Sequence, residues 1–101
     1  MEKLFNAPYN TVYIKSHQAA RQLEFRIYKE DISSGIILFK VGLSLWSFGE
    51  DFKISIESQE KNKTKVAIHS QSSIAVQAFD WGKNHENITE FFKTLTALIK
   101  E

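Results

Sequence analysis

The 101-residue chain contains no cysteine, and this absence removes three classes of site at once. Without thiols the protein has no disulfide framework, no cysteine nucleophile and no thiolate ligands for zinc. A chain that does without disulfides is compatible with a reducing compartment, so we predict a cytoplasmic protein. One proline and four glycines are too few for a glycine-rich phosphate loop or a flexible linker.

An excess of charge and a long apolar run are missing as well. Thirteen Lys and Arg residues against twelve Asp and Glu residues give a formal net charge of +1, so no global field would attract nucleic acid. The longest apolar stretch, residues 36–48, is interrupted by Lys40 and falls short of the roughly 18 to 20 residues that span a bilayer. The first residues lack the apolar segment of a signal peptide. We therefore predict neither a membrane span nor a secretion signal.

What the sequence does contain is enough apolar surface for one core. Hydrophobic residues make up 43% of the chain, and eight residues are Phe. No repeat or shift in composition divides the chain, and its length is close to the commonest domain size. These observations predict a single domain that comprises residues 1–101.

The first third of the sequence predicts a helix followed by a strand. Asn6 and Pro8 predict the helix start, as an N-cap and as a proline in the first turn. Apolar residues over 9–23 recur at intervals of three and four, which is typical of an amphipathic helix. From Phe25 onward the period changes to two, so we predict a strand in which Tyr28 points away from Phe25.

The middle of the chain predicts two further strands. Residues 36–45 are apolar on both sides, which is typical of a central or doubly covered strand. Phe52, Ile54 and Ile56 alternate with polar residues, as expected for a strand with one buried face. The turn-forming segments that separate the strands are residues 30–35, 47–51 and 58–63.

The last third predicts a strand, a turn and a long helix. The strand begins at Thr64, and the turn is Asp80-Trp81-Gly82-Lys83-Asn84. The helix then presents a wide apolar stripe that suits a sheet: Ile88, Phe91, Phe92, Leu95, Leu98 and Ile99.

These elements predict an α+β fold, a two-layer sandwich. An antiparallel sheet of about four or five strands carries the N- and C-terminal helices on one face. If Leu4 and Phe5 add a short edge strand, the order is β-α-β4-α; otherwise it is α-β4-α. Either order leaves the second face of the sheet open.

The C-terminal third resembles the closing signature of bacterial domain-of-unknown-function families. Its motifs are Thr64-x-Val66-x-Ile68-x-Ser70-x-Ser72, Asp80-x-Gly82-x-Asn84 and Ile88-x-x-Phe91. The order of helices and strands is also similar to that of TATA-binding-protein-like and Bet v1-like folds. The resemblance implies a small bacterial α+β domain and transfers no catalytic residue.

A search for catalytic chemistry finds no motif. The three histidines, His17, His69 and His85, are scattered and have no metal-ligand spacing. No serine lies in a nucleophile motif. We predict a protein that is not an enzyme and has no cofactor or metal. Asp80 and Trp81, beside the predicted turn, are open to two interpretations: a structural cap with a core-sealing aromatic, or part of a site.

The open sheet face is the best candidate for function. Its predicted apolar residues are Tyr28, Ile36, Leu38 and Trp46, and apolar sheet faces are seldom left in water. We therefore predict a protein-interaction module that binds a second copy of itself or another protein. His69 and Trp81 are further candidate contact residues.

Two alternatives remain open. A small hydrophobic ligand or lipid could bind in a cleft between the sheet and the C-terminal helix, lined by Phe39, Phe52, Phe91 and Leu95. Nucleic acid could bind basic residues of the open face, although Glu57 and the near-neutral net charge argue against it. The basic and aromatic residues of that second alternative are Arg26, Tyr28, Lys40, Lys53, Lys65 and His69.

Overall fold

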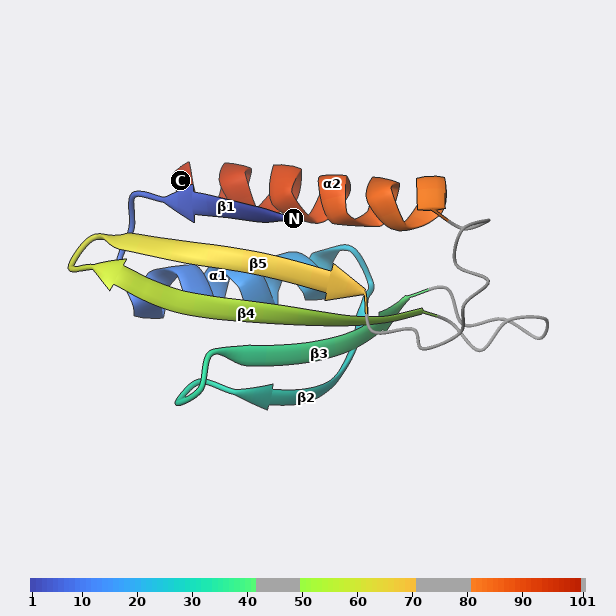
Figure 1. The fold of residues 1–101 in the computed structure, drawn as a ribbon, viewed down its shortest axis with the longest axis horizontal. Coiled ribbons are helices and arrows are strands. Elements are labelled where there is room, and N and C mark those ends of the chain that lie inside the picture. The colour runs from blue at the N-terminus through green and yellow to red at the C-terminus, as the bar shows by residue number, and fades with distance from the viewer. Residues whose placement is uncertain (42–49, 71–80, 101) are drawn as a thin grey trace.

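The computed structural model describes residues 1–41, 50–70 and 81–100, and it confirms the order β-α-β4-α (Figure 1). The elements are β1 (Glu2–Phe5), α1 (Tyr9–Gln22), β2 (Arg26–Asp31), β3 (Ile36–Val41), β4 (Glu50–Glu60), β5 (Lys63–Ser70) and α2 (Trp81–Lys100). None of the described helices has both the length and the hydropathy needed to cross a membrane.

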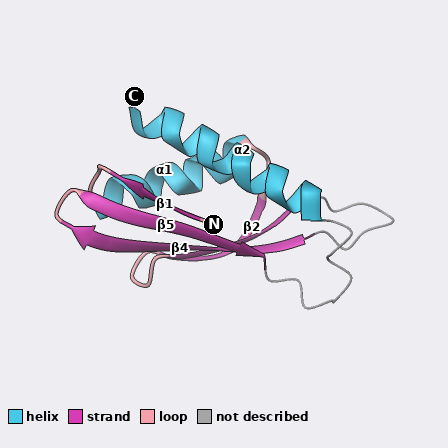
Figure 2. Ribbon diagram, turned by 45° about the horizontal axis from the view of Figure 1, so that its top comes forward, coloured by secondary structure: helices cyan, strands magenta, loops and turns pink. Residues whose placement is uncertain are grey.

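The five strands form one antiparallel sheet in the order β1-β5-β4-β3-β2. The predicted strand at Leu4 and Phe5 is confirmed: β1 pairs with β5 and lies at one edge, while β2 lies at the other. Both helices cover the same face of the sheet, as Figure 2 shows. The fold is therefore the predicted two-layer α+β sandwich with one face of the sheet left open.

A single hydrophobic core joins the helices to the sheet. Phe39 lies at its centre and stacks on three aromatic rings, those of Phe25, Phe52 and Phe91, at centroid distances of 4.8, 5.3 and 6.4 Å. The rest of the core comes from the buried faces of both helices and from the inward residues of the strands. Burial of these side chains stabilises the fold by roughly 1.5 to 3 kcal/mol each before chain entropy is counted.

The start of α1 differs from the prediction. The helix begins at Tyr9, and Pro8 is its N-cap in an extended conformation with no side-chain cap, so Asn6 is not the cap. Proline disfavours helical backbone at the residue before it, so Ala7 stays outside the helix. The carbonyl of Ala7 instead accepts a 2.8 Å hydrogen bond from the buried Thr64 hydroxyl, which ties the helix start to β5.

The end of α1 is a Schellman turn that sends the chain directly into β2. Phe25 N–H donates to the Ala20 carbonyl at 2.9 Å, and Glu24 N–H donates to the Arg21 carbonyl at 3.0 Å. Glu24 stands at the left-handed position of this motif with φ of 62°, where glycine is the usual residue. The turn brings β2 alongside the C-terminal half of α1.

The predicted turn over residues 30–35 is confirmed for residues 32–35, which connect β2 to β3, whereas Glu30 and Asp31 belong to β2. Gly35 has φ of 73°, and a Cβ at this position would lie 2.1 Å from the Ile56 carbonyl oxygen. Ile56 N–H donates to the Gly35 carbonyl at 2.7 Å, which explains the close approach. Glycine is required here both by its positive φ and by the space available.

Three predicted boundaries are wrong. Glu50 and Asp51 belong to β4 rather than to a turn, and β4 extends to Glu60, so only residues 61–62 connect it to β5. The residues at both ends of β4 are polar, so in the sequence they resemble a turn. In the structure they pair with the neighbouring strands. Trp81 to Asn84 lie in α2 instead of a turn, because a helix of 20 residues tolerates one glycine at a cost of about 1 kcal/mol. Asp80 lies outside the described residues.

Candidate interaction surface

The open face of the sheet carries the side chains that alternate with the core residues. The strand register aligns them in rows across the sheet, such as His69, Lys53 and Leu38 on β5, β4 and β3. We define the open face by these residues: Glu2, Leu4, Arg26, Tyr28, Lys29, Asp31, Ile36, Leu38, Lys40, Asp51, Lys53, Ser55, Glu57, Lys65, Ala67 and His69. In Figure 1 this face is turned toward the reader, with α1 behind it.

Most of the predicted contact residues lie together on this face. Ile36 and Leu38 are half-buried on β3, and Tyr28 is 49% exposed on the neighbouring edge strand β2. His69 is exposed on β5, at the far end of the row that contains Leu38. The structure therefore brings these four residues onto one surface that spans the sheet.

Two predicted candidates are not placed on this face by the structure. Trp46 lies outside the described residues. Trp81 is the first residue of α2, on the helical layer rather than on a strand of the sheet, and its side chain is not described.

Tyr28 is held on the open face by a charged pair on β3 and β4. Its hydroxyl donates to Asp51 Oδ1 at 3.2 Å, and Lys40 Nζ lies 5.6 Å from the centre of its ring. Lys40 Nζ is also 3.7 Å from Asp51 Oδ1. Burial raises the pKa of Tyr28, and the neighbouring Asp51 carboxylate raises it further. A bulge between Ile27 and Lys29 makes room for this arrangement at the sheet edge.

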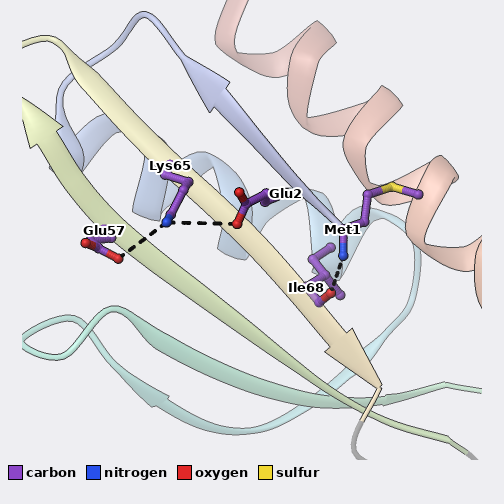
Figure 3. Close-up of polar contacts among 5 residues, drawn as sticks. All are labelled: Met1, Glu2, Glu57, Lys65 and Ile68. Carbon is purple, nitrogen blue, oxygen red and sulfur yellow. Dashed lines mark hydrogen bonds and ion pairs between the residues drawn. The ribbon is translucent and has the colours of Figure 1, made fainter.

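A second charged cluster crosses the other half of the open face. Lys65 Nζ lies 3.9 Å from a carboxylate oxygen of Glu57 and 3.9 Å from one of Glu2, which links β4, β5 and β1 (Figure 3). Such partly exposed pairs contribute little to stability, in the range of about 0 to 1 kcal/mol. They matter for the charge pattern of the open face, because they place acidic groups beside its lysines.

Leu4 is a contact candidate that sequence reasoning missed. It lies on β1 opposite Lys65 and is 60% exposed, so it adds an apolar side chain to the open face. The sequence did contain a signal for this position. Adjacent strand residues point to opposite faces, so a buried Phe5 places Leu4 on the open face.

The four residues predicted to line a ligand cleft lie in the core. Phe39, Phe52, Phe91 and Leu95 are all at most 1% exposed, and the Phe39 ring stacks on the other two rings. An open crevice of about 380 Å³ does lie between β1 and α2, but other residues line it. They are Met1, Glu2, Lys3, Thr89, Phe92 and Lys93.

The basic residues of the open face are interleaved with acids. Lys40 and Lys65 each have a carboxylate within 4 Å, which lowers the field they present to a polyanion. Among residues 1–41, 50–70 and 81–100, no three His, Asp or Glu side chains are grouped so that they could hold a metal ion.

The chain was also compared with known proteins. No protein-family model matches it, and a search of curated proteins finds no match.

Proposed function

We propose that the protein is a non-enzymatic interaction module that binds a second copy of itself through the open face. The observation that supports this proposal is the break in alternation on β3. On β4 the outward residues are polar or charged, as expected of a solvated face, whereas β3 places Ile36 and Leu38 outward. Tyr28 lies beside them on β2, and Leu4 adds an exposed apolar side chain at the opposite edge of the sheet.

The charge distribution favours a second copy over a polyanion. In a two-fold dimer the same patch occurs on both partners, so residue i of one copy meets residue j of the other and the reverse. The open face carries acids and bases in two separate clusters, around Asp51 and around Lys65. A surface with both signs can complement itself when rotated, while nucleic acid would meet Asp51, Glu57 and Glu2 as repulsive groups.

The place of this module in the cell follows from composition and resemblance. The absence of cysteine supports a reducing cytoplasm, and the resemblance of the last third to bacterial domain-of-unknown-function families supports a bacterial protein.

Leu38→Lys tests the proposal, because it places a charge at the apolar centre of the open face. We expect the wild type to dimerise in sedimentation-velocity experiments from micromolar to submillimolar concentrations, and Leu38→Lys to remain monomeric with an unchanged circular dichroism spectrum. Ile14→Lys is the matched control, since Ile14 is an exposed aliphatic residue on α1, in the other layer. A wild type that stays monomeric throughout, or equal loss of dimer in both variants, contradicts self-association.

A second candidate function is the binding of a small hydrophobic ligand. The observation in its favour is the crevice between β1 and α2, whose lining includes the apolar Phe92 and Met1 and the basic Lys3 and Lys93. Such a lining suits an apolar chain with an anionic head. Native mass spectrometry of gently purified protein separates the two functions: self-association gives a dimer without added mass, and ligand binding gives a monomer with a reproducible adduct.

A further inference from the structure

A second crevice lies on the helical side of the sheet, between the C-terminal half of α1 and the edge strand β2. Its volume is about 480 Å³, within the range of roughly 300 to 1,000 Å³ that is common for small-ligand sites. His17 and Arg21 line it from α1, Phe25 and Ile27 form its apolar part, and β2 completes it with Tyr28, Lys29 and Glu30. Neither the open face nor its proposed dimer uses the residues of α1 that form it.

The backbone turn between α1 and β2 creates this crevice. Because Glu24 adopts positive φ, the chain reverses within two residues, and Phe25 packs under the helix end. Phe25 is anchored there by its parallel stack on Phe39 at 4.8 Å. The apolar part of the crevice is therefore formed by a side chain that belongs to the packed core.

Arg21 supplies the crevice with a cationic group that no acid holds. The acid that lines the crevice, Glu30, is already engaged by His17 Nε2, and Lys29 pairs with Leu38, so its side chain is directed to the open face. Within the described part of the chain, Arg21 has no carboxylate within 4 Å. A guanidinium beside an apolar surface forms a site for an anion that carries an apolar body.

The edge of β2 argues against a peptide strand as the occupant. The bulge at Tyr28 interrupts the regular spacing of backbone groups, and Lys29, Glu30 and Asp31 follow in sequence. Bulges and charged residues on an edge strand oppose pairing with another strand. The crevice therefore suits a compact molecule better than an added strand.

We propose that this crevice binds a small organic carboxylate, with Arg21 holding the carboxylate and Phe25 and Ile27 contacting its apolar or aromatic body. Arg21 makes the principal polar contact, because its planar guanidinium can donate two parallel hydrogen bonds to one carboxylate. Glu30 opposes the ligand by charge, and its carboxylate contacts His17 Nε2.

Phenylacetate is a suitable probe, with phenylacetamide as its neutral analogue of the same shape. In ¹H–¹⁵N correlation spectra, we expect saturable shifts from phenylacetate at amides of residues 17–30 and at least tenfold weaker binding of phenylacetamide. Absence of saturable shifts up to the solubility limit of the probe overturns the proposal. Equal affinity for the two probes overturns the role of Arg21.

Two substitutions in the crevice should change the affinity for phenylacetate in opposite directions. Arg21→Gln should weaken phenylacetate binding about tenfold or more, because it removes a charge-assisted bidentate contact. Glu30→Gln should tighten binding a few-fold, because it removes the opposing charge. Arg26→Gln is the matched control, since Arg26 lies on β2 but faces the open side of the sheet. Equal weakening by Arg21→Gln and Arg26→Gln would show a non-specific charge effect and reject the site.

Discussion

At the scale of single residues, Glu24 shows how a local motif can impose strain. The carbonyls of Ala20 and Arg21 accept the two hydrogen bonds of the Schellman turn, and these bonds require a left-handed residue between α1 and β2. Left-handed backbone costs an L-residue with a Cβ roughly 1 to 2 kcal/mol. Glu24 is exposed, so the motif rather than its side chain fixes the φ of 62°.

Glu24→Gly should therefore stabilise the protein. We expect the free energy of unfolding to rise by about 0.5 to 1 kcal/mol, because the relief of strain exceeds the entropy that glycine adds to the unfolded chain. Urea titration at neutral pH measures the change. Gln18→Gly is the control, since Gln18 is exposed within α1, and it should lower the free energy by about 1 kcal/mol. Destabilisation by both changes would contradict the strain at Glu24.

At the scale of elements, α1 is fastened to β2 and its turn by residues spaced one helical turn apart. The Tyr9 hydroxyl donates to the Ile32 carbonyl at 2.6 Å, and His17 pairs with Glu30. Tyr13 lies between them, and burial raises its pKa, with the Glu30 carboxylate raising it further. Burial and then the Asp31 carboxylate raise the pKa of Tyr9 in the same way. Neutral phenols are thus part of the contact between α1 and β2.

This contact predicts a loss of stability at alkaline pH. A tyrosine whose pKa is raised on folding stabilises the fold fully below its unfolded pKa of about 10, and that stability is lost as pH rises through the folded pKa. Tyr13→Phe should lose less stability than the wild type between about pH 9 and pH 11, where the unfolded tyrosine ionises. Urea titrations across this range give both slopes, and lysine ionisation contributes equally to the two proteins. Identical slopes would show that Tyr13 ionises as freely in the folded state as in the unfolded one.

Elements could be predicted where burial dictates the pattern, and their boundaries could not. Phe52, Ile54 and Ile56 alternate because every second residue enters the core, and this pattern located β4 correctly. The end of β4 was missed because residues 58–60 are polar and exposed, so their strand pairing with β5 leaves no hydrophobic signal. The start of α1 depended on a backbone effect, the restriction that Pro8 places on the residue before it.

The candidate sites divide in the same way. Tyr28, Ile36 and Leu38 could be assigned to one face, because parity within a strand is visible in the sequence. The crevice that contains Arg21 could not be predicted, because it depends on how closely α1 packs against the edge strand after a turn built on backbone hydrogen bonds. A glutamate at the left-handed position gave no sequence signal for that turn.

At the scale of the whole molecule, β3 separates the two surfaces that matter. Phe39 points into the core, where it stacks on Phe25, Phe52 and Phe91, while its neighbour Leu38 points to the open face. Substitutions at these two adjacent residues of β3 should therefore affect different processes. Phe39 belongs to the folding of a single chain, and Leu38 belongs to the proposed association of two chains.

Alanine substitutions at these two positions should differ in their dependence on protein concentration. Phe39→Ala should lower the free energy of unfolding by about 3 to 5 kcal/mol at any concentration, because it opens a cavity at the centre of the core. Leu38→Ala should cost about 1 kcal/mol or less in dilute solution, where the monomer is measured, because Leu38 is only half-buried. In concentrated solution its cost should grow, since association adds stability that only the wild type gains. Thermal unfolding at two concentrations tests this, and a Leu38→Ala cost that does not change with concentration would remove Leu38 from the interface.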